Sequence, residues 1–468
     1  MIELVKGKKF DDNHSAMVIN VKEFIPHSNA DKLKCCKVGT YNIITSIDAE
    51  PGLYVYFQKE SVINPNFLSF ANLYRHAELN ADNTKTGMFE DSGRIKTIKL
   101  RGELSEGFII PAVVFENFIT SVTNQNITLT EGTEFDTVQN GDKSFWVIKK
   151  WVVQKTPGTP GGGKSRVKVP ARLFDRVIPE QFRFHYTTIV IKKCPMVITP
   201  DSVLNISEKI HGTSGISANV LVKSQYHKLG LVGNWITRHI IDPIFRLNTR
   251  NIKDATYYDN LYASRTVIKN QYISEQVGEG YYGVDVWAEA NKIVAPKLPK
   301  GYTAYYEIVG FLPNGGYIQK GYDYGCVPPK EGEPYTPEVN FKVRIYRITI
   351  TNVDGNVYEL TPQEVTRWCE RNGLKSVSTW WEGKASDLYP ELDKETHFSE
   401  NFIAKLADDA RFYMEKSSPS CTNNVPHEGV VIKIIGRNSE AFKLKCFKFL
   451  DKEHKALDAG ESNIEDEA

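Results

Sequence analysis

The sequence has little of several features that define large protein classes. Its seven cysteines include no Cys-x-x-Cys pair and no histidines at zinc-finger spacing, which excludes a zinc-ribbon or zinc-finger scaffold and is typical of reduced thiols in an intracellular protein. No stretch approaches the roughly 18 consecutive apolar residues that a membrane span needs. The first residues also lack the apolar core of a signal peptide. We therefore expect a soluble, cytoplasmic protein with no membrane partner.

An excess of charge of one sign is also missing. Lys and Arg total 58 and Asp and Glu total 57, which gives a formal net charge of +1. Any binding of nucleic acid must therefore come from local basic patches and not from an overall cationic field. With 468 residues and 41% hydrophobic content, the chain is long enough for two or three domains.

The first quarter of the sequence consists of short β-prone runs separated by turn signals. The runs are 16–19, 41–44, 53–57 and 107–110, and their spacing predicts a small β-barrel or sandwich. Two further stretches, 27–33 and 94–103, resemble parts of the OB-fold modules that bind tRNA and other nucleic acids. We therefore expect residues 1–125 to form an OB-fold nucleic-acid-binding domain.

Basic residues recur along the second of these stretches, which we predict to be one strand. They are Arg94, Lys96, Lys99 and Arg101. Such a row can follow a phosphate backbone and so bind nucleic acid. The alternative is a solvated barrel edge that its charge protects from aggregation, and the sequence favours neither reading.

A connecting region follows, at 126–177, and it contains a match to the Walker A pattern. Residues 158–165 read Gly-Thr-Pro-Gly-Gly-Gly-Lys-Ser, which fits that pattern. A phosphate-binding P-loop must open into a helix, whereas residues 166–170 are β-prone and end in proline. We therefore interpret the segment as a flexible, basic Gly/Pro loop.

The remaining body, 178–455, mixes strands and helices, and an acidic disordered tail is expected at 456–468. One helix is predicted to start at Thr361-Pro362 and to end before Gly373. Ser399 is the expected N-cap of a second helix. The predicted apolar face of that second helix consists of Phe402, Ile403, Leu406, Ala410 and Tyr413.

Three separated motifs in this body point to nucleotide chemistry: 208–213 (Glu-Lys-Ile-His-Gly-Thr), 428–433 (Glu-Gly-Val-Val-Ile-Lys) and 442–445 (Phe-Lys-Leu-Lys). A lysine that attacks an α-phosphate must be a free amine, so its ordinary pKa of about 10.4 has to fall toward neutral pH. Neighbouring positive charge has this effect.

Lys443 and Lys445 can supply that charge, because residues two apart on a strand point to one face. Glu428, at the lip of a buried strand, suits a carboxylate that reaches a divalent metal. Taken singly, a Lys-x-Lys strand is a solvated face and a Glu-Gly pair is a turn. The ordered set of motifs is what favours chemistry.

Together the motifs resemble the covalent nucleotidyltransferase superfamily of DNA ligases, RNA ligases and mRNA-capping guanylyltransferases. The resemblance implies that Lys209 is the nucleophile. It also implies a set of residues around the bound nucleotide, with Glu307 at the ribose and Tyr346 stacked on the base. The full set is Glu208, Ile210, Gly212, Arg265, Glu307, Tyr346 and Lys433.

Two positions in this resemblance carry alternatives. Arg265 falls where the superfamily has an arginine that contacts phosphate or the nucleic-acid end, and it is equally well a surface residue of a polar loop. His211 stands where an aspartate is usual; a Lys-x-His-Gly motif is similar to that of a group of RNA ligases, and the other interpretation is a satisfied histidine in a tight turn.

The order of segments favours one branch of the superfamily. DNA ligases and capping enzymes place an OB domain after the last lysine strand, and too few residues follow Lys445 here for one. The whole chain resembles the ATP-dependent RNA ligases that carry an OB module in front. The expected fold is thus α+β, with an N-terminal OB-fold β-barrel followed by a nucleotidyltransferase ligase domain that is ATP-grasp-like, with mostly antiparallel sheets.

The resemblance implies a reaction and its cofactors. Lys209 would form lysyl-AMP from ATP, transfer the AMP to a 5′-phosphate and promote sealing to a 3′-hydroxyl, with nicked RNA duplexes in RNA repair as the expected substrate of a monomer. Glu428 and Glu307 would hold Mg²⁺ or Mn²⁺, while Lys443 and Lys445 would neutralise the α-phosphate. The alternatives are a GTP-dependent capping-type guanylyltransferase and a non-catalytic OB-fold protein that binds tRNA or other RNA.

Overall fold

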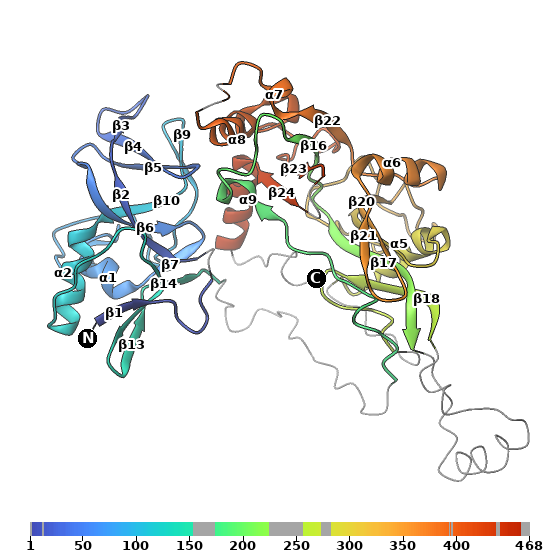
Figure 1. The fold of residues 1–468 in the computed structure, drawn as a ribbon, viewed down its shortest axis with the longest axis horizontal. Coiled ribbons are helices and arrows are strands. Elements are labelled where there is room, and N and C mark those ends of the chain that lie inside the picture. The colour runs from blue at the N-terminus through green and yellow to red at the C-terminus, as the bar shows by residue number, and fades with distance from the viewer. Residues whose placement is uncertain are drawn as a thin grey trace, which may run out of the picture.

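The structure is a computed structural model that describes residues 2–11, 14–152, 174–223, 256–272, 282–392, 394, 396–436 and 440–459. Figure 1 shows the N-terminal strands on one side, two large sheets on the other, and helix α9 (Phe447–Asp458) between them. Strand pairing is antiparallel except between β15 (Ile189–Val190) and β24 (Ala441–Lys445) and at a few isolated bridges. The fold is therefore mixed α and β with mostly antiparallel sheets, as predicted.

The N-terminal part is built from several small sheets. The largest has the order β10-β6-β2-β11, with β10 Gly107–Pro111, β6 Gly52–Gln58, β2 Ala16–Val21 and β11 Glu134–Phe135. A second has the order β1-β12-β13, with β1 Ile2–Val5, β12 Thr137–Asn140 and β13 Lys143–Trp146. A third has the order β3-β4-β5, with β3 Ile25–Pro26, β4 Leu33–Val38 and β5 Tyr41–Ser46. Two pairs complete the set, β14 Ile148–Lys150 with β7 Ser61–Ile63, and β8 Ile98–Leu100 with β9 Glu103–Ser105.

An aromatic core joins these sheets to two helices, α1 (Pro65–Phe70) and α2 (Ala112–Thr123). Phe57 of β6 and Phe115 of α2 are fully buried, and the rings of Phe67 and Phe115 meet edge to face at 5.2 Å. All four predicted β-prone runs lie inside strands of this part. The hydrogen-bonded ladders of the described residues form open sheets, and none of them closes into a barrel.

Strand pairing moves one boundary that the sequence suggested. β11, β12 and β14 pair with β2, β1 and β7, respectively. Residues 134–150 therefore belong with the N-terminal strands, and we place the end of this part after Lys150 instead of at 125. Local sequence patterns do not show this boundary, because the partners of these three strands lie far earlier in the chain, in β1, β2 and β7. The Walker-like segment 158–165 lies outside the described residues.

The second part contains two five-stranded sheets, which we call the β16 sheet and the β17 sheet. The β16 sheet has the order β15-β24-β23-β16-β22, with β23 Gly429–Ile434, β16 Val203–Glu208 and β22 Thr379–Lys384. The β17 sheet has the order β18-β17-β19-β20-β21, with β18 Thr256–Ser264, β17 Thr213–Lys223, β19 Tyr302–Gly310, β20 Phe341–Thr351 and β21 Val357–Glu359. The chain crosses from the first sheet to the second between Glu208 and Thr213.

Helices cover these sheets. Helix α5 (Val286–Val294) packs on the β17 sheet through the buried Trp287, whose indole N–H donates to the Ser214 carbonyl (2.9 Å). Helix α6 (Pro362–Arg371) starts after Thr361, as predicted. The remaining helices of the described residues around the β16 sheet are α7 (Ala385–Leu388) and α8 (Phe398–Asp408). No helix in the described ranges is long and apolar enough to cross a membrane.

Three predictions about α8 and α9 need correction. The N-cap of α8 is His397, and Ser399 is buried inside the helix, where its hydroxyl accepts the Ile198 N–H (3.2 Å). The expected face is only partly helical, because Ala410 and Tyr413 lie beyond the last turn of α8, and Tyr413 is 39% exposed. The predicted tail begins too early, since α9 continues to Asp458. These three differences arise from tertiary contacts that a local pattern does not contain.

Candidate functional site

A cavity opens where the chain crosses between the β16 and β17 sheets. Alternating residues of three adjacent strands form one wall, since Ser207 lies opposite Val431 and Val431 lies opposite Lys443 in the ladders. The full lining is His185, Tyr186, Thr187, Thr188, Ser207, Glu208, Lys209, Ile210, Gly212, Thr213, Ser214, Arg265, Glu307, Tyr346, Arg347, Val377, Val431, Lys433, Ala441 and Lys443. All seven residues predicted around a nucleotide thus line one cavity.

Lys209 lines this cavity and is held by both its backbone and its side chain. Its N–H donates to the Gly429 carbonyl (2.9 Å), which extends the pairing of β16 with β23 by one residue. Its Nζ lies 2.6 Å from Oε1 of Glu428, a carboxylate that is 1% exposed. The carboxylate fixes the amine in place and also favours its protonated form.

The lysine pair of β24 lies on one face of the strand, as the alternation predicts. Phe442 and Leu444 are buried in the core, and the two lysine side chains point to the opposite face. Lys443 lines the cavity. Lys445 is outside the lining, with Nζ 3.5 Å from Glu428 Oε1 and 3.1 Å from Glu453 Oε2. Lys209 and Lys445 therefore both place an ammonium group within 4 Å of Glu428 Oε1.

Two glycines in the motifs allow close backbone approach. A Cβ at Gly212 would lie 2.5 Å from the Ile308 carbonyl oxygen and 3.1 Å from Glu307 Oε2. A Cβ at Gly429 would lie 2.0 Å from the Leu444 carbonyl oxygen, and Gly429 has a φ of +139°. Side chains are excluded at both positions, so the crossing segment can lie against β19 and β23 can lie against β24.

The opposite wall comes from the β17 sheet. Glu307 pairs with Ser214 in the β17–β19 ladder, and both line the cavity. The Tyr346 hydroxyl lies 3.2 Å from the Ser214 hydroxyl. Lys433 connects the two sheets, because it extends from β23 to donate to the Tyr346 carbonyl (3.1 Å). Arg265, which follows the end of β18, also lines the cavity.

Basic side chains give the cavity a positive character, and burial and charge together change the pKa values of its titratable groups. Burial lowers the pKa of His185 to about 3, and the nearby positive charges of Arg347, Lys433, Arg265 and Lys209 add to that effect. Burial also lowers the pKa of Lys433. Five basic side chains line the cavity against two acidic ones, which suits a polyanionic ligand.

Glu208 differs from the other acidic residues of the site. It is 4% exposed, lines the cavity, and accepts a hydrogen bond from the Ser420 hydroxyl (2.9 Å). Burial raises the pKa of its carboxyl group. This residue therefore presents a polar group to the cavity with less tendency to ionise than an exposed glutamate.

The structure adds lining residues that the motif analysis did not assign. His185 meets the Tyr346 ring edge to face at 5.0 Å, and Arg347 lies over the Tyr186 ring at 4.6 Å. Arg347 is 7% exposed and pairs with Glu359 through a 2.8 Å contact. The sequence offered only a weak signal for these residues, since a His-Tyr pair in an irregular segment lacks the repeating apolar pattern that indicates a helix or a strand.

His211 packs against two aromatic rings. Its backbone N–H donates to the Tyr324 hydroxyl (2.7 Å), and its ring meets the Tyr322 and Phe449 rings edge to face at 4.8 and 4.9 Å. Its Nδ1 lies 3.8 Å from Glu428 Oε2. The contacts resemble those of a packed histidine in a turn and also place the ring beside the buried carboxylate.

The carboxylates can be tested as ligands for a divalent cation. Neither oxygen of the buried Glu428 accepts an aligned hydrogen bond, so the group retains capacity for a cation. In the described part of the chain, no three His, Cys, Asp or Glu side chains gather as a metal-binding set. Mg²⁺ commonly uses one or two carboxylates together with substrate phosphates and water, and Glu428 suits that arrangement.

The four basic residues predicted to bind nucleic acid are not on one strand. β8 covers only Ile98–Leu100. Arg94 is 5% exposed and pairs with Glu60 and Asp458, and Lys96 also pairs with Asp458. Lys99 and Arg101 are exposed. Arg94 is therefore unable to follow a phosphate backbone in this structure, and the single-strand prediction is wrong for it.

Comparison with known proteins gives one kind of match. No protein-family model and no curated protein matches the chain. The chain is similar to RNA ligases. An arginine-to-alanine mutant of Naegleria gruberi RNA ligase with ATP and Mn is 15% identical, with a TM-score of 0.47 over 94% of this chain and 98% of that chain. The ligase with PPi is 16% identical, with a TM-score of 0.47 and the same coverage.

A lysine-to-alanine mutant of the same ligase with ATP and Mn is 15% identical, with a TM-score of 0.46 over 93% of this chain and 98% of that chain. Identity at this level does not carry a residue's role from one protein to the other. The function is therefore argued from the cavity itself.

Proposed function

We propose that this protein is an ATP-dependent RNA ligase that forms a lysyl-AMP intermediate on Lys209. The observation that carries the proposal is the position of Lys209, which lines a cavity rich in basic side chains and lies 2.6 Å from the buried Glu428. The motifs around it are those that resemble the covalent nucleotidyltransferases. On this proposal, residues 178–455 form a nucleotidyltransferase domain and the N-terminal part is an OB-type module.

The first step needs Lys209 as a free amine. Its nitrogen attacks the α-phosphorus of ATP, a phosphorus–nitrogen bond forms, and the bond from the α-phosphorus to the bridging oxygen breaks to release pyrophosphate. The attacking amine loses one proton to solvent and keeps one N–H in the phosphoramidate. Cationic side chains in the cavity, among them Lys443 and Arg265, stabilise the charge that develops on the phosphate oxygens.

The remaining steps transfer the AMP. An oxygen of a 5′-phosphate attacks the lysyl-AMP phosphorus, the phosphorus–nitrogen bond breaks, and Lys209 is regenerated. A 3′-hydroxyl then attacks the adenylated 5′-phosphorus, loses its proton to solvent and displaces AMP. The product is a phosphodiester bond. We propose nicked RNA duplexes as the substrate, because the N-terminal part, taken as an OB-type module, lies across α9 from the β16 sheet (Figure 1) and would hold a strand that is already paired.

The nucleotide is held by groups from both sheets. Glu307 suits the ribose hydroxyls as an acceptor, the Tyr346 ring suits stacking on the base, and Glu208 faces the same cavity. Glu428 and Glu307 are the carboxylates that would hold Mg²⁺ or Mn²⁺, which supplies neutralisation of phosphate charge when bound. Glu428 Oε1 already lies 2.6 Å from Lys209 Nζ, so this carboxylate would be shared between the lysine and the cation.

The test is transfer of a labelled nucleotide to the protein. Purified protein is incubated with Mg²⁺ and each α-³²P nucleoside triphosphate in turn, and denatured protein is examined for acid-resistant label. We expect label from ATP, none in Lys209→Ala, and full label in Lys330→Ala, which removes a lysine that is 82% exposed. Label from GTP alone would indicate a capping-type enzyme, and no label would indicate an RNA-binding protein without catalysis.

A further inference from the structure

Helix α9 contacts both parts of the molecule. It begins at Phe447, directly after the lysine strand β24, and Figure 1 shows it between the N-terminal strands and the β16 sheet. Residues one apart on a helix project about 100° apart, whereas residues four apart share a face. Glu453 and His454 therefore point in different directions, and His454 shares its face with Asp458.

One side of α9 holds Lys445. Both carboxylate oxygens of Glu453 accept hydrogen bonds from Lys445 Nζ, at 3.1 and 3.2 Å. The Phe449 ring lies 4.9 Å from the same ammonium. Charge-assisted bonds of this kind are stronger than neutral ones, and the side chains of Lys445 and Glu453 are only 17% and 18% exposed. Glu453 thus fixes the ammonium group that also lies near Glu428.

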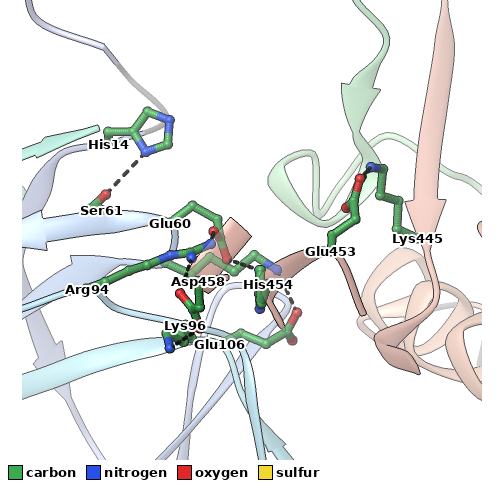
Figure 2. A network of polar contacts seen from close by, with 11 residues as sticks. His14, Glu60, Ser61, Arg94, Lys96, Glu106, Lys445, Glu453, His454 and Asp458 are labelled. Carbon is green, nitrogen blue, oxygen red and sulfur yellow. Dashed lines mark hydrogen bonds and ion pairs between the residues drawn. The ribbon is translucent and has the colours of Figure 1, made fainter. Parts of the chain in front are cut away.

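The other side of α9 docks on the N-terminal part. His454 Nε2 lies 2.7 Å from Glu60 Oε1, and Asp458 pairs with Arg94 and Lys96 at 3.1 and 2.6 Å. Figure 2 shows the two ends of this network, with Lys445 and Glu453 on one side and the Glu60, Arg94, Lys96, His454 and Asp458 cluster on the other.

The N-terminal end of this contact is rigidly held. Arg94 pairs with Glu60 at 2.7 Å and stacks over the Trp151 ring at 3.8 Å. Glu60 has a φ of +61°, and its backbone N–H donates to the Ile95 carbonyl while its carbonyl accepts the Trp151 N–H. A left-handed non-glycine residue persists only where its surroundings fix it. The docking cluster is therefore a defined surface and not a chance pairing of flexible side chains.

We propose that α9 couples docking of the N-terminal part to the position of Lys445, with Glu453 as the positioning residue. The inference rests on the proposed function, because it concerns a lysine of that site. Docking through His454 and Asp458 sets where α9 lies, and Glu453 transmits this position to Lys445. The N-terminal part then acts on nucleotidyl transfer as well as on the RNA.

The test measures single-turnover formation of labelled protein from ATP at a range of ATP concentrations. We expect Glu453→Gln to lower the maximal rate by about tenfold, the effect of losing one charge-assisted bond, while the ATP concentration for half-maximal rate stays within about twofold. Glu453→Asp keeps the charge and should remain within about threefold of wild type. A purely structural role for Glu453 would not separate the two parameters in this way.

Asp458→Asn tests the coupling from the N-terminal side, and Asp451→Asn is the matched control. Asp451 is an α9 carboxylate that pairs with Lys455 of the same helix. We expect Asp458→Asn to slow labelling by about threefold, Asp451→Asn to leave it unchanged, and the Glu453→Gln/Asp458→Asn double variant to be no slower than Glu453→Gln alone.

Three outcomes distinguish failure of the proposed function from failure of the positioning role and failure of the coupling. Absence of label on the wild-type protein would contradict the proposed function. Normal label on wild type with unchanged rates in Glu453→Gln would overturn the positioning role alone. Multiplied effects in the double variant would show that Asp458 acts independently of Glu453, which would overturn the coupling. A far-ultraviolet circular dichroism melt confirms that each variant is folded, and Asp458→Asn, compared with Asp451→Asn, provides the measurement if Glu453→Gln does not fold.

Discussion

Gly212 decides how closely the crossing segment lies to β19. Its hydrogen atom stands where a Cβ would meet the Ile308 carbonyl oxygen at 2.5 Å and the Val309 Cγ1 at 2.8 Å. Backbone atoms do not yield as a flexible side chain does. The position of Lys209, three residues earlier, depends on this contact.

We therefore expect Gly212→Ala to displace the crossing segment and to abolish nucleotide labelling, with a loss of about 1–3 kcal/mol in the free energy of unfolding. Chemical denaturation and the labelling assay measure the two effects. Gly316→Ala is the control, because the nearest atom to its Cβ is a side-chain oxygen at 3.2 Å. Full labelling of Gly212→Ala would contradict the close-packing account.

His185 should make the free energy of unfolding depend on pH. Burial, with the charges of Arg347, Lys433, Arg265 and Lys209, lowers its pKa in the folded state from 6.5 to about 3. The unfolded chain therefore binds a proton first as pH falls, and the stability that neutral His185 provides is present above pH 6.5 and is lost between pH 6.5 and 3.

We expect the stability difference between wild type and His185→Asn to shrink as pH falls through this window. Urea denaturation at several pH values measures it. His397→Asn, which changes a histidine whose side chain is 69% exposed, is the control variant. A constant difference for His185→Asn from pH 6.5 to 4 would show that the imidazole is not held neutral.

At the scale of elements, α6 shows how local sequence alone can fix a helix start. Thr361 Oγ1 accepts the Glu364 N–H (3.3 Å), and Glu364 Oε2 accepts the Thr361 N–H (2.7 Å). Pro362 occupies the first helical position, where its missing N–H costs nothing. Each partner is within three residues, which is why the sequence predicted this helix correctly.

Thr361→Ala should lower the free energy of unfolding by about 1 kcal/mol, because it removes one half of the capping box. Labelling with ATP should not change, since α6 does not line the cavity. Thr361→Ser retains the hydroxyl and should stay near wild type. Equal stability of the alanine and serine variants in urea denaturation would mean that the cap contributes nothing.

At the scale of the whole molecule, buried ion pairs join the two parts. Glu106, which is 4% exposed, pairs with Lys59 of the N-terminal part at 3.0 Å and with Lys192 of the second part at 2.7 Å. Burial acts to raise the pKa of Glu106, but the two lysines hold it below its ordinary value. The Thr40 hydroxyl also donates to the Lys192 carbonyl.

Glu106→Gln leaves two largely buried ammonium groups without their shared carboxylate, so we expect a loss of about 3–5 kcal/mol in the free energy of unfolding. Small-angle scattering should also show a larger radius of gyration as the two parts separate. Glu131→Gln, at an exposed turn, is the control. An unchanged scattering curve for Glu106→Gln would show that other contacts hold the parts together.

The sequence by itself determined the features whose partners are near in the chain. It predicted the four N-terminal β runs, the α6 cap, and the common face of Lys443 and Lys445, because turn residues, capping residues and the strand period act over a few residues. The ordered motifs also identified residues that the fold brings to one cavity, although they come from separate strands.

Only the tertiary structure decided which charged side chains are free to act. Arg94 and Asp458 lie 364 positions apart and pair in the docking cluster, so a residue that reads as a surface base in the sequence is buried. His185 and Arg347 also line the cavity, and the sequence had given neither residue a role. Charged side chains do not follow a repeating sequence pattern that reveals their partners. Those partners are set by how distant segments of the chain pack together.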